Sequence, residues 1–312
     1  MKKNISNLLF ILLILLISYE VLKESEIVIN SVKFSFNIWQ NNIFPSLFPF
    51  FIIGYILISL GLPEILGEIF KNITYKLFKI NSNASFIIIL SMLSGFPSSA
   101  KYTKELLDKG VIDQYDAAKI LTFTHFSNPL FILGAVTTFV GNKSLGIPIL
   151  ISHYLGNFII GILLRNYNKK EKDNSKISLK NIRLNDINIG STLTNSITSA
   201  INTLLLILGT ITVFLIITSL INNIFNINGI YKPIINGLFE MTQGLKYLEF
   251  LNINSNLKAL IAVAILSFGG LSVHMQVITI ISDTKIKYFP YFITRILHVL
   301  ISSLIFIIWK II

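Results

Sequence analysis

The sequence turns polar inside a hydrophobic run at Leu90-Ser91-Met92-Leu93-Ser94-Gly95-Phe96-Pro97-Ser98-Ser99-Ala100-Lys101. A helix that only fills a bilayer has no use for glycine, proline, serines and a lysine in its middle. Backbone that faces lipid finds no water to bond, so an interrupted helix at membrane depth must be buried in protein or line a polar cavity. A second stretch has a similar character: Leu266-Ser267-Phe268-Gly269-Gly270-Leu271-Ser272-Val273-His274-Met275-Gln276. Both breaks therefore point to a site inside a membrane protein.

The composition supports this class. Hydrophobic residues make up 53% of the 312 residues, charged residues 13%, and the mean hydropathy is +0.72, values that soluble domains rarely reach. Much of the net charge of +11 falls in short loops between apolar spans, where Lys and Arg mark the cytoplasmic side. We therefore expect a multi-pass protein of the lipid bilayer and no nucleic-acid partner. The chain has no cysteine, which excludes a disulfide framework and thiol catalysis.

The first half of the chain predicts two spans and a hairpin. Residues 1–34 are expected to form an uncleaved N-terminal transmembrane helix, with its N-terminus in the cytoplasm, and an external loop. A span over 37–62 then enters from the outside, and a loop over 63–83 follows. The apolar run 86–93 is far shorter than the roughly 20 residues that a helix needs to cross the bilayer. Together with the amphipathic segment 101–113, it predicts a re-entrant hairpin.

A basic loop over 165–190 fixes the predicted orientation. Six basic residues place this loop in the cytoplasm: Lys169, Lys170, Lys172, Lys176, Lys180 and Arg183. Counting crossings from the N-terminus gives the same side only if the hairpin does not cross. The remaining predicted segments are an apolar stretch over 117–140 that breaks at Ser127-Asn128-Pro129, a span over 145–164, an outward span over 197–221, an amphipathic segment over 234–248, the second break within 259–281, and a last span over 291–311 that returns to the inside.

The two halves predict an inverted repeat, with one unit over 35–165, a connecting basic loop over 166–190 and a second unit over 191–312. Aligning 87–112 with 261–286 needs no gap and pairs Gly95 with Gly269. The predicted fold is an all-α polytopic membrane protein with two inverted-topology repeats that contain re-entrant or broken-helix hairpins. Such repeats place a binding site near the midplane, where their broken helices meet.

The first break has the chemistry of an anion site. A helix that restarts after Pro97 aims free N–H groups and its positive dipole end into the cavity, and Lys101 adds a full charge. The candidate substrate-binding residues are Ser94, Gly95, Pro97, Ser98, Ser99, Lys101, His125, Asn128, Gly269, Gly270, Ser272, His274 and Gln276.

Simpler roles compete with these assignments. Ser91 and Ser94 equally fit close helix packing, and Lys101 also fits, less well, a side chain that reaches the cytoplasmic interface. His153 and His298 lie among apolar residues and are predicted to form interhelical hydrogen bonds. The chain carries no metal-binding, nucleophile–base or phosphate-loop motif, so we expect no enzyme activity, no cofactor and no metal.

Four motifs together resemble one family: Ser94-Gly95-Phe96-Pro97-Ser98-Ser99-Ala100-Lys101, Ser127-Asn128-Pro129-Leu130-Phe131-Ile132-Leu133-Gly134, Glu240-Met241-Thr242-Gln243-Gly244 and Gly269-Gly270-Leu271-Ser272-Val273-His274-Met275-Gln276-Val277. They are similar to the YlbJ (SpoVV) family of sporulation integral membrane proteins, within the nucleoside-recognition or Gate domain group. The resemblance covers about residues 45–311. It implies a role in endospore formation. The protein would lie in the outer forespore membrane, which is the mother-cell membrane around the forespore, and would pass dipicolinic acid toward the forespore.

Three functions stay open at this point. The leading hypothesis is a transporter or facilitator for a small organic anion. The second is a nucleoside or nucleobase carrier, as the wider group suggests. The third is a non-transporting membrane component that assembles or gates a partner complex, so the possible protein partners are a second copy of the chain or another sporulation membrane protein.

Overall fold

The computed structural model describes residues 2–167 and 185–311, and it confirms an all-α membrane fold. Within the described residues, five helical stretches are long and apolar enough to cross a membrane: Ser25–Ser59, Lys143–Leu163, Ile189–Phe225, Ser255–Ile281 and Tyr288–Lys310. Ala84–Ser94 and Pro129–Val140 are shorter apolar helices. The six basic residues predicted to hold the loop in the cytoplasm, Lys169 to Arg183, lie outside the described residues.

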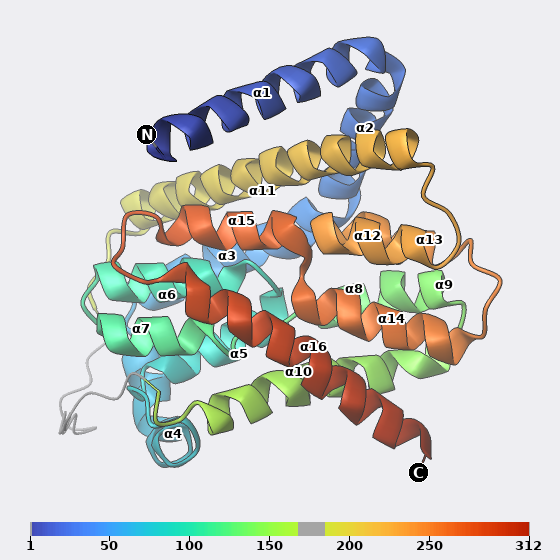
Figure 1. The fold of residues 1–312 in the computed structure, drawn as a ribbon. Helices are drawn as coiled ribbons and strands as arrows, with labels where there is room; N and C mark the ends of the chain where they lie inside the picture. Colours follow the sequence, from blue (N-terminus) through green and yellow to red (C-terminus); the bar gives the residue numbers. More distant parts are fainter. Residues whose placement is uncertain (1, 168–184, 312) are drawn as a thin grey trace.

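The helices run mostly between two ends of one bundle (Figure 1). We call one of them the loop end, because the chain enters and leaves the basic loop there. At this end Lys79 Nζ donates to Asn166 Oδ1 over 2.7 Å, and Asn185 Nδ2 donates to Ser59 O over 3.1 Å. The opposite end, on the right in Figure 1, is called the far end.

The N-terminal part is helical almost throughout. α1 (Lys2–Lys23) is followed after one residue by α2 (Ser25–Ile38), which continues through the π-helical turn η1 (Trp39–Ile43) into α3 (Phe44–Ser59). This long helix ends at the loop end. The predicted external loop before residue 35 is therefore wrong, because the span begins at Ser25. The predicted loop over 63–83 is also mostly a helix, α4 (Leu62–Phe78), which lies across the loop end (Figure 1).

The first break is the tip of a hairpin, as the short apolar run predicted. α5 (Ala84–Ser94) enters from the loop end, and α6 (Ser98–Asp108) packs against it on the way back. Gly95 makes the turn with a φ of 84°, a conformation that suits glycine. The backbone N–H of Asn81 donates to Asp116 Oδ2 over 3.1 Å, which shows that the chain is back at the loop end after the hairpin.

The next crossing is a broken helix. α7 (Gln114–Leu121) runs inward from the loop end and stops, and residues 122–128 continue without regular structure. α8 (Pro129–Phe131), the π-helical turn η2 (Ile132–Val136) and α9 (Thr137–Val140) then lead to the far end. A short 3₁₀ turn, η3 (Lys143–Leu145), connects to α10 (Gly146–Leu163), which returns to the loop end and confirms the predicted span.

The second half contains a hairpin that the sequence did not predict. α11 (Ile189–Phe225) crosses to the far end, and the predicted amphipathic segment 234–248 proves to be a hairpin of α12 (Tyr231–Phe239) and α13 (Met241–Tyr247). These two short helices pack against each other, and their tip, Glu240, points into the protein. The hairpin therefore enters from the far end, opposite to the first one.

The second break does not form a hairpin. α14 (Ser255–Phe268) and α15 (Gly270–Ile281) run in the same direction from the far end to the loop end (Figure 1). Lys104 of α6 lies 2.7 Å from Asp283, so the chain after α15 has reached the loop end. Pairing Gly95 with Gly269 is therefore wrong, because Gly95 turns a hairpin whereas Gly269 interrupts a crossing helix.

The last helix, α16 (Tyr288–Ile311), consequently runs from the loop end to the far end. Its contacts with the antiparallel α10 show the direction: Arg295 bonds to Asn157, and Phe306 belongs to the same apolar cluster as Leu145 and Ile149 at the start of α10. The prediction that the last span returns to the side of the basic loop is wrong, because α14 and α15 already complete a crossing. In both halves a hairpin is followed by a broken helix and then by an unbroken one.

Candidate functional site

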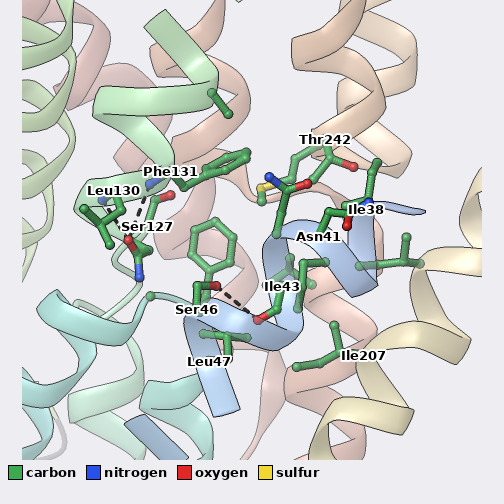
Figure 2. Close-up of a pocket in the computed structure, with 18 of the residues that line it drawn as sticks. Ile38, Asn41, Ile43, Ser46, Leu47, Ser127, Leu130, Phe131, Ile207 and Thr242 are labelled. Atoms are coloured by element: carbon green, nitrogen blue, oxygen red, sulfur yellow. Dashed lines mark hydrogen bonds between the residues drawn. The ribbon is translucent and has the colours of Figure 1, made fainter. Parts of the chain in front are cut away.

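A central cavity of about 680 Å³ lies where both hairpins and both broken helices meet. The first hairpin contributes Ser94, Gly95 and Phe96, and the second contributes Glu240, Met241 and Thr242. The other walls come from α2, η1, α3, residues 127–139, α11 and α15. Figure 2 shows Ser127, Leu130 and Phe131 on one side of the cavity and Asn41 and Thr242 on the other.

The first hairpin tip touches the first broken helix very closely. A Cβ built on Gly95 would lie 2.6 Å from the backbone nitrogen of Asn128, so a larger residue has no room there. Asn128 Nδ2 donates to Leu93 O and Ser94 O over 3.1 and 3.3 Å, while Asn128 Oδ1 accepts from Leu130 N over 2.7 Å. One side chain thus holds the end of α5 and caps the start of α8.

The second hairpin tip brings a buried carboxylate to the cavity. Glu240 is 1% exposed and lines the cavity. Its Oε2 accepts hydrogen bonds from the Thr242 hydroxyl and, over 2.9 Å, from the backbone N–H of Gln243. Glu240 therefore caps α13. A Cβ on Gly270 would lie 3.0 Å from Met241 N, so this tip also contacts the start of α15.

The remaining polar wall comes from the long N-terminal helix. Asn37, Asn41, Asn42 and Ser46 line the cavity around η1. A π-helical turn displaces side chains from the regular helix register and is often found at functional sites. None of these four residues is among the candidates predicted from the sequence. The amides crowded into an otherwise apolar helix were the available indication.

Four of the predicted site residues line the central cavity, and one lines a second cavity. Ser94, Gly95, Asn128 and Gln276 line the central cavity. Lys101 instead lines a cavity of about 650 Å³ nearer the loop end, where its Nζ donates to Ser199 Oγ over 2.6 Å and lies 3.3 Å from Glu105. Lys101 is 5% exposed, so it does not extend to the interface.

The other candidates lie behind the cavity wall, lining neither cavity: Pro97, Ser98, Ser99, His125, Gly269, Gly270, Ser272 and His274. Ser98 Oγ accepts from Ser94 Oγ over 2.7 Å and donates to Gly95 O, so it stabilises the hairpin turn. His274 Nδ1 lies 2.6 Å from Tyr288 Oη, and its Nε2 lies 3.0 Å from Phe268 O at the second break. Their part in substrate binding stays a prediction.

A buried polar network on α16 supports both breaks. Arg295 is completely buried; it donates to Thr122 O over 2.5 Å, at the end of α7, and to Asn157 Oδ1 over 3.2 Å. One turn further on, His298 Nδ1 lies 3.2 Å from Ser267 O, just before the second break, and its Nε2 lies 2.7 Å from His153 O. His153 and His298 thus form interhelical hydrogen bonds, as predicted. Through Arg295 and His298, α16 contacts both the end of α7 and the end of α14.

The two breaks also touch each other. His125, in the first break, stacks on Phe96 at a centroid distance of 4.5 Å, and its Nδ1 lies 2.8 Å from Tyr291 Oη. A Cβ on Gly269 would come within 2.5 Å of His125 Nε2, so glycine is required for this contact. The breaks, the first hairpin tip and α16 therefore form one packed unit behind the cavity.

Two hairpins that enter from opposite ends and meet two broken helices at a central cavity define an all-α, multi-pass membrane protein. The chain is 30% identical to the sporulation integral membrane protein YlbJ of Bacillus subtilis (strain 168), over 98% of this chain and 84% of that protein. The chain therefore belongs to the YlbJ family of sporulation integral membrane proteins. No protein-family model and no solved structure matches it.

Proposed function

We propose that the protein passes a small organic anion across the membrane, and that dipicolinic acid is its solute during sporulation. The central cavity is the observation that carries this proposal. Its volume of about 680 Å³ lies within the range of roughly 300 to 1,000 Å³ that is typical of small-molecule sites. Hairpin tips and helix breaks at such a cavity expose backbone polar groups where a solute can use them.

The helix starts around the cavity favour a negative charge on the solute. α8 and α13 are capped by the side chains of Asn128 and Glu240, whereas α6 and α15 begin at Pro97 and Gly269 without a side-chain cap. α6 starts directly after the hairpin tip that lines the cavity, and the positive end of a helix dipole attracts anions. Lys246 also lines the cavity and adds a positive charge. A small dicarboxylate fits this distribution.

The sporulation role of the family supports a more specific location. We propose that the protein resides in the outer forespore membrane, with its N-terminus in the mother-cell cytoplasm, and that dipicolinic acid moves toward the forespore. The dominance of basic residues in the loop over 165–190 supports this orientation.

A nucleoside or nucleobase carrier is the second candidate, and Glu240 is the observation that favours it. A buried carboxylate and several amides around one cavity suit a neutral solute that offers hydroxyl or N–H donors. Glu240, Asn41, Asn42, Asn128 and Gln276 supply these groups.

Ligand binding to the purified protein separates the candidates. Labelled dipicolinate and labelled uridine are each measured by equilibrium binding in detergent, with the other compound as competitor. We expect saturable dipicolinate binding that uridine does not displace. Saturable uridine binding without dipicolinate binding would support the second candidate, a nucleoside or nucleobase carrier. Binding of neither compound would contradict both and favour a non-transporting membrane component.

A further inference from the structure

We propose that the solute route runs from the central cavity to the loop-side cavity between α6, α11 and α15, and that this structure holds the route closed. The closure is a septum about one helical turn thick. It is the layer of protein between Thr203 and Ile207 of α11 and between Gln276 and Thr279 of α15. The loop-side cavity is the second cavity, of about 650 Å³, which contains Lys101. The inference rests on the proposed function for the identity of the solute, but the geometry of the route stands independently of it.

One face of α15 lines both cavities. Val273 and Gln276 face the central cavity, and Thr279 and Ile280 face the loop-side cavity, which Ser282 and Asp283 just after α15 also line. Residues three, four and seven positions apart lie on the same side of a helix. Gln276 and Thr279 are three residues apart, which corresponds to a rise of about 4.5 Å. The two cavities are therefore successive sections along one helix face.

α11 repeats this arrangement on the facing side. Ser199 and Thr203 line the loop-side cavity, and Ile207 and Ile211 line the central cavity. These four residues follow each other at intervals of four and so form a row along the helix. Thr203 and Ile207 are separated by a rise of about 6 Å. On both helices, the residues that line the central cavity and those that line the loop-side cavity are thus separated by about one helical turn, at the septum.

Two polar ties close the route at this level. On the central side, Gln276 Nε2 of α15 donates to Thr210 Oγ1 of α11 over 3.1 Å. On the loop side, Lys101 of α6 donates to Ser199 Oγ and Thr203 Oγ1 of α11 over 2.6 and 3.1 Å. The Lys101 ammonium also lies 5.2 Å from the ring centroid of the buried Phe51. Lys101 is therefore positioned to meet an anion only after it has passed the septum.

The opposite side of the central cavity is occupied by buried polar side chains. Behind the first hairpin tip, Arg295, His298, His153 and Asn157 are each completely buried and bonded to one another or to backbone carbonyls. The row along α11 and α15 is the face on which both described cavities lie.

Thiol labelling tests the route directly, because the native chain has no cysteine. Single-cysteine variants are reconstituted in vesicles of known orientation and treated with a charged, membrane-impermeant thiol reagent from one side at a time. Ala135→Cys and Val273→Cys report on the central cavity, and Asn202→Cys and Thr279→Cys report on the loop-side cavity. The matched controls are Val213→Cys on α11 and Met275→Cys on α15, which are 53% and 42% exposed on the protein surface but line neither cavity.

We expect the loop-side pair to react from the loop side and the central pair to be shielded from that side by the septum. The rates from the two sides should differ by at least about ten-fold, because only a thiol in contact with water ionises to the reactive thiolate. The two lipid-facing controls should stay unmodified. Reaction of both pairs from the same side at similar rates, or of the controls as fast as the cavity positions, would overturn the proposed route. Failure of dipicolinate to bind would contradict the proposed function and leave this labelling pattern unchanged.

Discussion

Gly95 lies so close to Asn128 that a Cβ on the glycine would stand 2.6 Å from the asparagine backbone nitrogen. The tip of the first hairpin is thus fixed against the first broken helix by the absence of a side chain. Asn128 completes the contact, because its amide group bonds both to the end of α5 and to the start of α8. This single junction sets the position of two elements that line the central cavity.

Replacing Gly95 by alanine should therefore disrupt the site. The new Cβ meets backbone, and alanine must adopt a φ near 84°, at a cost of about 1 to 3 kcal/mol. We expect a lower thermal unfolding temperature in detergent and loss of dipicolinate binding. Gly209→Ala on α11 is the control, because nothing lies within 4 Å of its added Cβ. Equal stability of the two variants would contradict this view of the junction.

The Arg295 guanidinium should be important for stability, since it bonds to Thr122 O and Asn157 Oδ1 in a completely buried position. Arg295→Met leaves these two acceptors without partners, at a cost of about 1 to 3 kcal/mol each. Arg295→Lys keeps the charge but loses the planar fork of donors, so its loss should be smaller.

The measurement is thermal unfolding of both variants beside Lys310→Met, a change at the exposed end of α16. An unfolding temperature of Arg295→Met equal to that of the wild type would show that the network on α16 does not stabilise the breaks.

Replacing the Glu240 carboxyl group by an amide should improve anion binding. Glu240→Gln keeps an oxygen that can cap α13 and removes from the cavity wall a carboxyl group whose ionised form repels a nearby anion. We expect several-fold tighter dipicolinate binding by equilibrium titration. Glu249→Gln, in the exposed loop after α13, should leave the affinity unchanged. Weaker dipicolinate binding in Glu240→Gln would argue that the carboxylate accepts a hydrogen bond from the solute.

Lys246→Met should have the opposite effect. Lys246 lines the central cavity, with its Nζ 4.4 Å from the ring centroid of Phe34. Loss of its charge should weaken dipicolinate binding several-fold and leave uridine binding unchanged. Lys258→Met on α14, whose lysine lines neither cavity, serves as the matched control in the same titration. A similar small effect of both changes would place the anion elsewhere in the cavity.

Several parts of the fold could be predicted because they depend on length and local chemistry. The run 86–93 is too short to cross a bilayer, and glycine and proline at 95 and 97 end it, so the first hairpin followed from the sequence. The second hairpin did not, because 234–248 has the amphipathic pattern of one continuous helix. Its interruption at Glu240 comes from a side-chain cap rather than from glycine or proline.

The candidate site could be predicted only in part, for a similar reason. Ser94, Gly95, Asn128 and Gln276 lie next to visible breaks and line the central cavity. His125 and His274 also lie next to breaks, yet they point into the packed interior and bond to tyrosines. The direction of a side chain at a break depends on which helix packs against it, and tertiary contacts set that choice.

Uptake of dipicolinate by the purified protein in liposomes tests the central claim most directly. The account predicts saturable, protein-dependent uptake that Gly95→Ala abolishes while the amount of inserted protein stays equal to that of Gly209→Ala. Uptake no faster than in protein-free liposomes, from a protein that is correctly folded and inserted, would contradict it.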